Sequence, residues 1–407
     1  MAHMAPLMNS VEQIVRNGLC TGCGLCAGIA PDSIRMRMTD AGYLRPQVVA
    51  PVPSAANKDI DAACPGMVVA HQRASTPYHP IWGPVQACRT GYSTDTEVRH
   101  QGSSGGGISA LLIHLLQTGQ IDFAAHIAVS NEDPLRNELQ LSANREDVIR
   151  GAGSRYAPAA PLARLGELIQ SGKRYAFVGK PCDVAALRQY LRQRPEHQAS
   201  FPFLLSFMCA GTPSLKGTHQ VIRKLGFQPQ EVVKFRYRGD GWPGMAKAET
   251  QDGRSAEMDY ASSWGTVLNQ HLQLRCKICP DGTGEFADVV CADAWYGKDG
   301  YPDFAERDGR SLILSRTPKG EALVQAAAKA QAIVMSDLPV DDLAQMQHYQ
   351  LNRKTMVLGR AIATKLRLGQ APKYAHLGLI KASTQARPIE WLRNAAGTYR
   401  RAKGEIA

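Results

Sequence analysis

Three cysteines near the start of the chain constrain its fold and chemistry more than any other feature. They are Cys20, Cys23 and Cys26, in the run Cys-Thr-Gly-Cys-Gly-Leu-Cys. Ferredoxin-like chains use this spacing to hold three corners of a cubane iron–sulfur cluster, and a further cysteine followed by proline comes four residues later. Here that place is Ala30, followed by Pro31, so the fourth ligand must be remote. The pair Cys64-Pro65 supplies one, and the sequence predicts a 4Fe–4S cluster on Cys20, Cys23, Cys26 and Cys64.

A zinc site is the alternative for these cysteines. Paired Cys-x-x-Cys segments also suit tetrahedral zinc. Three overlapping short spacings together with a cysteine–proline partner favour the cluster.

Most of the chain must serve another purpose, because 407 residues far exceed a ferredoxin. We predict a ferredoxin-like iron–sulfur domain over residues 1–78, a larger domain over 79–345 and a basic helical extension over 346–407. Ten cysteines without a secretory segment indicate a reducing compartment, with the cytoplasm as the expected location. No apolar run reaches the roughly 18 residues that span a bilayer, so no transmembrane segment is expected.

The net charge of +11 is concentrated at one end of the chain. Residues 351–407 hold twelve Lys or Arg against Glu390 and Glu405. A solvated surface is one interpretation. The other is a docking surface for an acidic ferredoxin-like electron donor, since complementary charge speeds encounters between redox proteins. No basic motif interleaved with aromatic residues supports nucleic-acid binding.

Beyond residue 84 the pattern alternates between helix and strand, which predicts an α/β (α+β) fold with a mixed sheet covered by helices. Residues 32–70 are expected to be irregular because of Pro46, Pro51 and Pro53, and residues 72–84 are expected to form a linker. The expected strands are 123–129, 174–178 and 203–208, and the expected helices are 108–117, 162–171, 184–191 and 215–225.

A second cluster is suggested by four more cysteines. Cys182 and Cys209 follow two of the expected strands, at the edge where open α/β sheets build their sites. Cys276 and Cys279 form a Cys-x-x-Cys pair followed by Pro280. Such a pair is weak evidence by itself because redox dithiols and zinc also use it. Cys88 and Cys291 are left over and are expected to be small buried apolar residues.

Two glycine-rich segments are candidates for binding a phosphate-bearing cofactor. Ser103, Ser104, Gly105, Gly106 and Gly107 come directly before an amphipathic helix, where free amides favour an anion, although a plain turn would look the same. Gly153, Ser154, Arg155 and Tyr156 add a guanidinium for a pyrophosphate and a ring for stacking. The spacing is not that of a Rossmann nicotinamide site. FAD suits the combination, because a flavin converts one-electron transfers from clusters into hydride transfer.

Several ordered motifs resemble one family, the beta subunits of coenzyme F420 hydrogenase and related dehydrogenases, which includes 7-hydroxymethyl chlorophyll a reductase and ferredoxin-dependent divinyl chlorophyllide 8-vinyl reductase. The motifs are Cys20–Cys26, Ser104–Gly107, Gly153–Tyr156, Gly179–Asp183, Met208–Gly211, Phe235-Arg236 with Gly241-Trp242, Cys276–Cys279, and Ala287-Asp288 with Asp293–Trp295. Ala30, Lys180 and Cys291 depart from the family pattern.

The resemblance implies an FAD on the two glycine-rich segments, with Lys180 beside it, and one or two 4Fe–4S clusters. With two clusters, the second would use Cys182, Cys209, Cys276 and Cys279. The candidates for a proton donor beside the flavin are Asp183, Asp293, His100 and Tyr156, although a lone aspartate near a helix start is often only a cap.

Three functions compete on these grounds. The first is an oxidoreductase that passes electrons from a ferredoxin-like donor through two 4Fe–4S clusters to FAD, and then as hydride to a small organic substrate, reducing a conjugated double bond or removing a hydroxyl. The alternative is an electron-transfer beta subunit that oxidises or reduces coenzyme F420 for a partner hydrogenase or dehydrogenase. A homo-oligomer or a complex with a partner subunit suits either function. The third is an interaction module with one structural metal and no flavin.

Overall fold

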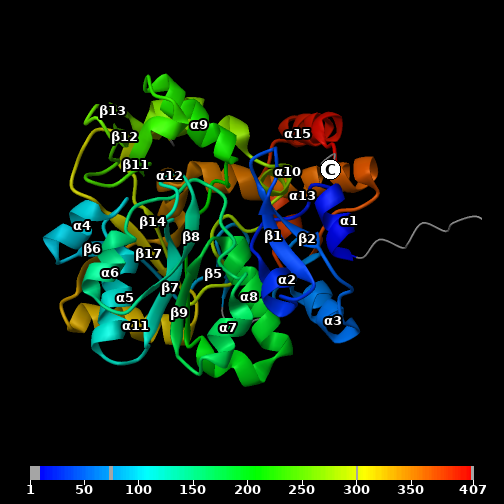
Figure 1. Ribbon diagram of the computed structural model, residues 1–407, viewed down its shortest axis with the longest axis horizontal. Helices are drawn as coiled ribbons and strands as arrows, with labels where there is room; N and C mark the ends of the chain where they lie inside the picture. Colours follow the sequence, from blue (N-terminus) through cyan, green and yellow to red (C-terminus); the bar gives the residue numbers. More distant parts are fainter. Residues whose placement is uncertain (1–9, 73–76, 299–300, 405–407) are drawn as a thin grey trace, which may run out of the picture.

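The computed structural model describes residues 10–72, 77–298 and 301–404 (Figure 1). Its centre is an eight-stranded sheet in the order β18-β6-β17-β14-β10-β9-β7-β8. The strands are β6 (Ala87–Ser93), β7 (Phe123–Val129), β8 (Asn137–Ser142), β9 (Tyr175–Gly179), β10 (Phe203–Phe207), β14 (Val289–Asp293), β17 (Ser311–Ser315) and β18 (Ile333–Asp337). The run β7-β9-β10-β14 is parallel, and the outer strands pair antiparallel. The sheet is therefore mixed, which confirms the predicted fold class.

Both faces of this sheet are buried. Successive residues of a strand point to opposite faces, so each strand contributes side chains to two cores. Along β9, Tyr175 and Phe177 enter one core while Ala176 and Val178 enter the other. Along β10, Leu204 enters the first of these cores, and Phe203 and Leu205 enter the second. Strands buried on both faces read as continuous apolar runs, which is why β7, β9 and β10 were predictable within one or two residues.

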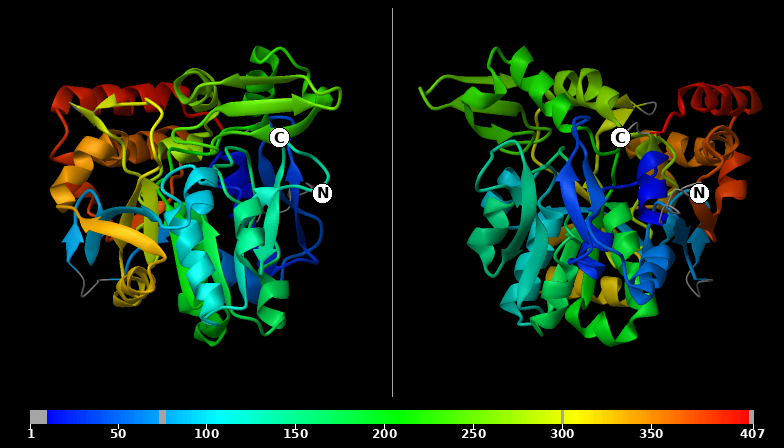
Figure 2. Two further views of the ribbon diagram at one scale, coloured as in Figure 1. Left: turned by 90° about the vertical axis from the view of Figure 1, so that its left-hand side faces the viewer. Right: turned by 45° about the vertical axis from the view of Figure 1, so that its right-hand side comes forward.

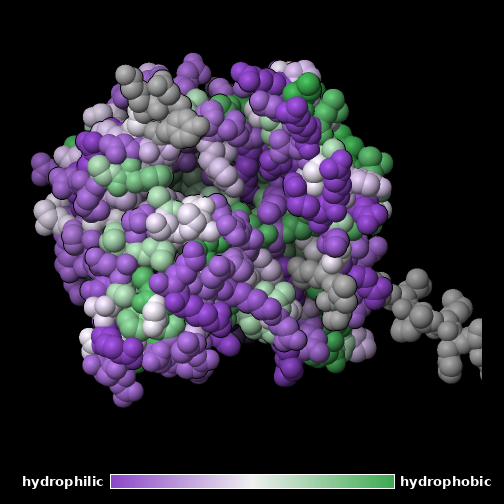
Figure 3. All heavy atoms as spheres, turned by 90° about the horizontal axis from the view of Figure 1, so that it is seen from above, coloured by the Kyte–Doolittle hydropathy of each residue, from purple (hydrophilic) through white to green (hydrophobic). Residues whose placement is uncertain are grey.

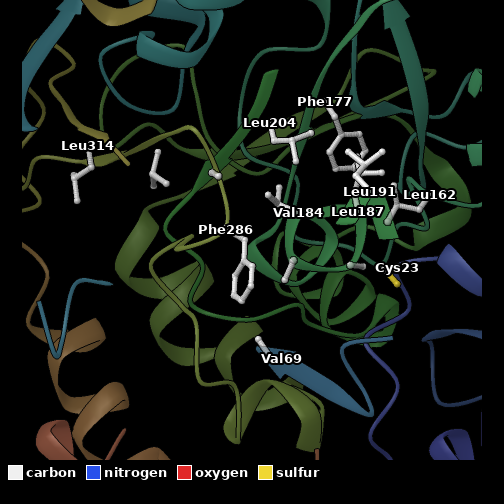
Figure 4. Packing of buried hydrophobic residues seen from close by; sticks show 14 of the residues in the cluster. Cys23, Val69, Leu162, Phe177, Val184, Leu187, Leu191, Leu204, Phe286 and Leu314 are labelled. Carbon is white, nitrogen blue, oxygen red and sulfur yellow. The ribbon is translucent and has the colours of Figure 1, made fainter. Parts of the chain in front are cut away.

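Helices cover the two faces as separate layers. One core holds α5 (Gly107–Gln117), α6 (Arg145–Arg150) and α11 (Pro318–Lys329). The other holds α7 (Leu165–Gln170) and α8 (Pro181–Gln193), and Figure 4 shows Val184, Leu187 and Leu191 of α8 packed with Phe177 and Leu204. Cys23 lies at the edge of this second core, beside Leu162.

The N-terminal segment is more regular than its prolines suggested. It contains α1 (Ser10–Arg16), α2 (Leu25–Ile29), β1 (Ile34–Met38), β2 (Leu44–Val48), α3 (Ser54–Ala63) and β3 (Val68–Ala70). The expectation of irregular structure over 32–70 is wrong, because Pro46 sits in β2 opposite Met36, in a two-stranded ladder where every strand is an edge. The expected linker is also not a simple one, since Ile81 and Trp82 are buried between β4 (Tyr78–His79) and β5 (Gly83–Pro84).

A small sheet lies at one end of the molecule, where the parallel strands of the main sheet finish (Figure 2). It consists of β11 (Val232–Arg236), β12 (Ala246–Thr250) and β13 (Ser255–Met258), and α9 (Leu215–Lys224) precedes it. The short helix α10 (Leu274–Lys277) and the hairpin β15 (Gly297–Lys298) and β16 (Tyr301–Pro302) complete the connections between β13 and β17.

The C-terminal part is helical, as predicted, but it is integrated into the fold. Its elements are α12 (Leu343–Met346), α13 (His348–Leu368), β19 (Lys373–Ala375), α14 (Leu379–Ser383) and α15 (Pro388–Arg401). Strand β19 pairs in parallel with β3 of the N-terminal segment. The division at residues 78 and 345 stays a prediction. No helix in the described part of the chain is both long and apolar enough to cross a bilayer.

Candidate functional site

Cys182 and Cys209 lie at the carboxyl edge of the main sheet, as predicted. Cys182 is the second residue of α8, directly after β9, and Cys209 comes two residues after β10. They line one hollow together with Cys276 and Cys279. The sequence-predicted second set is therefore brought together around a single space.

The first set of cysteines surrounds a neighbouring hollow. Cys20, Cys23, Cys26 and Cys64 line this space together with Val11 and Ile14 of α1 and with Met36 and Pro46 of the β1–β2 hairpin. Thr21 lines both hollows. The Arg275 guanidinium also donates from Nε (3.2 Å) and Nη2 (2.8 Å) to the carbonyl of Pro65. The two sets are thus adjacent and tied to each other.

The cysteine thiols are strongly shielded from water. Burial, followed by the charge of Asp183, raises the pKa of Cys23 to about 12. Burial, followed by the charge of Cys276, raises the pKa of Cys209 to about 12. Thiolates in such places require nearby positive charge, which a bound metal centre supplies. Among the residues that the structure describes, no three His, Cys, Asp or Glu side chains are placed so that they could hold a single metal ion.

Two buried arginines face the second hollow. Arg275 is 2% exposed and Arg353 is 6% exposed, and both line the space. Arg275 donates to the Pro65 carbonyl, and Arg353 Nη1 donates to the Cys209 carbonyl at 2.7 Å. Within the described ranges, no carboxylate forms an ion pair with either guanidinium. Because an unpaired buried cation is costly, this hollow suits an anionic group.

Backbone amides point at two of the sulfurs. Gly22 N–H donates to Cys20 Sγ at 3.3 Å, and Thr212 N–H donates to Cys276 Sγ at 3.4 Å. Gly22 has φ 78°, a conformation that glycine adopts without strain. Such bonds stabilise thiolate ligands and tune their reduction potential. The two sets fit iron–sulfur groups in sulfur number, amide donors and nearby positive charge.

The two glycine-rich segments meet. Ser154 N–H donates to Ser103 Oγ in a short hydrogen bond. Gly106 caps α5 with φ 71°, and a β-carbon there would lie 2.7 Å from the Val98 carbonyl oxygen. A β-carbon on Gly105 would lie 2.8 Å from the Gly91 carbonyl oxygen. The glycines are thus required for close packing.

Three of the predicted cofactor contacts have structural partners instead. Ser104 Oγ donates to the carbonyls of Ala292 and Arg310 and contacts Ser311 Oγ. Arg155 donates to Asn137 Oδ1 and to the carbonyls of Phe235, Pro134 and Arg136. Lys180 Nζ donates to Asp183 Oδ2 at 2.7 Å, beside the second set of cysteines. The sequence pattern could not distinguish these tethering roles from cofactor contacts.

Asp293 forms the centre of a charged group at the end of β14. Its carboxylate accepts a forked pair of bonds from Arg238, at 3.0 and 2.9 Å, and a third bond from Trp242 Nε1 at 2.7 Å. Arg238 is 2% exposed and also donates to the Ser103 carbonyl at 2.6 Å. Arg238 therefore connects the carboxylate to the glycine–serine segment.

Aromatic rings surround this ion pair. Tyr260 and Trp295 lie over the Arg238 guanidinium at 4.5 and 5.3 Å. Tyr156 accepts a hydrogen bond from Arg238 Nη1 at 3.3 Å and packs on Trp264 at 4.8 Å between centroids. Tyr156 and Asp293 are therefore brought together at one site. Trp242 is 2% exposed and is a packing residue.

The other two candidates for a proton donor, Asp183 and His100, lie outside the group around Asp293. Asp183 is buried and caps α8 by accepting from Lys180 N–H at 3.1 Å, the structural role anticipated for such an aspartate. Burial raises the pKa of Asp183, and Lys180 opposes this. His100 is exposed at the end of α4 (Thr96–Gln101), and its carbonyl accepts from Gly241 N–H.

The sequence did not single out Arg238, Arg275 or Arg353. Arg238 lies between Phe235-Arg236 and Gly241-Trp242, and Arg275 directly precedes Cys276. Their positions inside motifs were a usable signal. Arg353 belongs to the basic segment, where nothing distinguishes it from eleven other cations.

The carboxyl edge of the main sheet thus gathers four cysteines and two buried guanidinium groups, and a second set of four cysteines lies beside it in the N-terminal segment. Two family models match the chain, the N-term and C terminus of the coenzyme F420 hydrogenase/dehydrogenase beta subunit, over residues 88–166 and 172–340. The chain belongs to this family, as its motifs indicated.

Several relatives are named as oxidoreductases or as subunits of them. The coenzyme F420-dependent sulfite reductase of Methanocaldococcus jannaschii is 24% identical over 81% of this chain, which spans only 49% of that protein. The coenzyme F420 hydrogenase subunit beta of Methanosarcina barkeri is 22% identical over 60% of this chain and 79% of its own length. A chain of the F420-reducing NiFe hydrogenase complex from the same organism superposes with a TM-score of 0.56 at 19% identity, covering 73% of this chain and 99% of that one, and shows the same fold.

Proposed function

We propose that this protein is an iron–sulfur flavoprotein that exchanges electrons between a redox partner and coenzyme F420. The names of its relatives favour this alternative over the first expectation, hydride transfer to another small organic substrate. Coenzyme F420 takes up a hydride, whereas clusters pass single electrons, so a flavin between them has a clear purpose.

The observation that carries the proposal is the pair of adjacent hollows, each lined by four cysteines. One would hold a 4Fe–4S cluster on Cys20, Cys23, Cys26 and Cys64, and the other a cluster on Cys182, Cys209, Cys276 and Cys279. Thr21 lines both, so the two groups would lie close enough to exchange electrons. The unpaired Arg275 and Arg353 would balance the negative charge of the second group.

FAD would contact the places where the two glycine-rich segments meet. The residues that would take this role are Ser103, Gly106, Gly107, Gly153 and Tyr156. Ser104 and Arg155 would support the loops from behind. When bound, the flavin supplies the step between one-electron and two-electron chemistry.

The substrate side of the flavin would lie by Arg238 and Asp293. Their ion pair and the rings of Tyr156 and Tyr260 form a polar and aromatic wall beside the Ser103 carbonyl. A planar deazaflavin ring suits such a wall. A proton would be held at the Tyr156 hydroxyl, which accepts from Arg238.

Metal and flavin analysis of protein purified without oxygen tests the proposal. We expect about eight irons and one FAD per chain, with about four irons in either Cys64→Ala or Cys182→Ala. Cys88→Ala is the matched control, since Cys88 is buried in β6 and lines neither hollow. Reduced coenzyme F420 should then bleach the flavin absorbance. An iron content near four per chain that Cys182→Ala leaves unchanged would rule out the second cluster. If reduced coenzyme F420 does not bleach the flavin absorbance, coenzyme F420 would be ruled out as the substrate.

A further inference from the structure

A group of unpaired cations lies where the second set of cysteines approaches the surface. Lys277, between Cys276 and Cys279, is exposed. Arg360 of α13 donates from Nη1 to the Lys277 carbonyl at 3.2 Å and from Nη2 to Asn394 Oδ1 at 2.7 Å. Arg401 at the end of α15 is exposed and interacts electrostatically with both. In the described part of the chain, no carboxylate pairs with any of these three cations.

This cationic group continues inward to the cysteines. On α13, Arg353 lies about two helical turns before Arg360. Its guanidinium donates a hydrogen bond to the Cys209 carbonyl. Tyr349, beneath the Arg353 guanidinium, is 52% exposed and donates to the Ala210 carbonyl at 3.3 Å. Cys276 and Cys279 are themselves only partly buried. The second hollow is therefore close to the outer surface at this corner.

Apolar side chains are exposed on the same two helices. Leu366 of α13 is 74% exposed, and Ile389 and Leu392 of α15 are 61% and 59% exposed. In Figure 3, green residues lie among purple ones at the end of the molecule where Figure 1 places α13 and α15. Apolar residues with charged neighbours are typical of protein interfaces. Both helices lie beyond residue 340, where the match to the family models ends.

We infer that Lys277, Arg360 and Arg401, with the neighbouring faces of α13 and α15, form the docking surface for an acidic one-electron redox protein. The inference rests on the proposed function. Positive charge without counter-charge selects an acidic partner and speeds its approach. Because these cations lie beside Cys276 and Cys279, the partner would exchange electrons with the group held by the second set of cysteines. In each encounter the partner's reduced centre loses one electron and the iron–sulfur group of that set gains it.

Stopped-flow reduction of the holoprotein tests this surface, with a reduced acidic bacterial ferredoxin as the probe. The variant is the double substitution Lys277→Gln and Arg401→Gln. We expect its second-order rate constant at low ionic strength to fall about tenfold and its salt dependence to weaken. The matched control, Lys173→Gln with Lys329→Gln, removes the same charge from exposed positions next to α7 and on α11, at the far end of the molecule in Figure 1, and should stay within about twofold.

Dithionite separates the two levels of the argument, because this small reductant needs no docking surface. Dithionite bleaching that is equal in both variants, with a ferredoxin rate lowered only in Lys277→Gln/Arg401→Gln, supports the inference. Equal ferredoxin rates in the two variants would overturn it while leaving the proposed function intact. A wild-type protein without iron would overturn the proposed function itself. Co-sedimentation with phosphatidylserine vesicles that is lost in this variant, with an unchanged ferredoxin rate, would assign the cations to a lipid surface instead.

Discussion

At the scale of single residues, the second hollow depends on the buried charge of Arg353. Its guanidinium donates to the carbonyls of Cys209 and Cys276 and lies over the Tyr349 ring. No carboxylate pairs with it in the described part of the chain, so its positive charge acts on whatever the cysteines hold. A reduced cluster carries one more negative charge than an oxidised cluster and is stabilised more by this cation. We expect Arg353→Met to lower the potential of the proposed second cluster by roughly 60 mV or more, since 59 mV corresponds to about 1.4 kcal/mol for one electron.

Redox titration followed by electron paramagnetic resonance measures this shift. Arg353→Lys keeps the charge and should restore most of the potential, which a purely structural role for the guanidinium would not predict. Lys365→Met, on the exposed side of α13, is the control and should leave the potential unchanged. Equal potentials in Arg353→Met and wild type would contradict the assignment.

Glu285 is a residue whose charge makes stability depend on pH. Its side chain is fully buried, pairs with Lys354 and accepts from Tyr78 Oη at 2.7 Å. Burial alone would raise the pKa of Glu285, but Lys354 and then His71 outweigh it and lower the pKa from 4.5 to about 2. The unfolded chain therefore takes up a proton first as the pH falls. The stabilisation is complete above the unfolded pKa and is lost as the pH falls toward 2.

We expect Glu285→Gln to be less stable than wild type near neutral pH, and the difference to shrink by about 3 kcal/mol as the pH falls through this window. Urea unfolding of both proteins at a series of pH values measures the difference. Loss of acid-labile sulfide affects both proteins alike and cancels in the comparison. The exposed Glu132→Gln is the control. A difference that does not vary with pH would refute the coupling.

At the scale of elements, Gly106 in the turn between α4 and α5 is required both by its backbone conformation and by its close packing. Gly119, which follows α5, separates the two effects, because its left-handed conformation is similar, with φ 64° against 71° for Gly106. A β-carbon on Gly106 would meet the Val98 carbonyl at 2.7 Å, whereas one on Gly119 would meet nothing within 4 Å. We expect Gly119→Ala to cost about 1–2 kcal/mol of unfolding free energy and Gly106→Ala clearly more. Flavin content should fall only in Gly106→Ala, and equal flavin loss in both would contradict the placement of FAD at this turn.

Local patterns predicted some elements and misled on others, for identifiable reasons. Apolar runs and helix periodicity located β7, β9, β10 and α5, because most of their apolar side chains are buried in the two cores beside the main sheet. Pro46 was misleading, since a proline in a two-stranded ladder leaves the strand intact. Cysteine spacing, the Cys64-Pro65 pair and the places of Cys182 and Cys209 after two expected strands predicted the two sets that line the hollows. The partners of Arg155 and the pairing of Arg238 with Asp293 join segments far apart in the chain, and no local pattern records such contacts.

At the scale of the whole molecule, the two ends of the chain meet around the cysteine sets. Strand β19 pairs with β3, Lys373 N–H donates to the Met67 carbonyl at 2.7 Å, and Tyr374 Oη donates to the Ile278 carbonyl at 2.6 Å. The C-terminal segment thus holds the Cys64 loop and the Cys276–Cys279 segment together. We expect truncation after Gly369 to lower bound iron at both sets, measured as iron and sulfide per chain.

A second truncation separates support of the clusters from docking of a partner. Truncation after Ala386 removes α15 but keeps β19 and its pairing with β3. Because the contacts to Met67 and Ile278 remain, this protein should keep its iron. Its second-order rate constant for reduction by ferredoxin should fall, since Arg401 and the exposed face of α15 are gone. Full iron retention after truncation at Gly369 would show that the N-terminal segment and the main sheet hold the cysteine sets without the C-terminal strand.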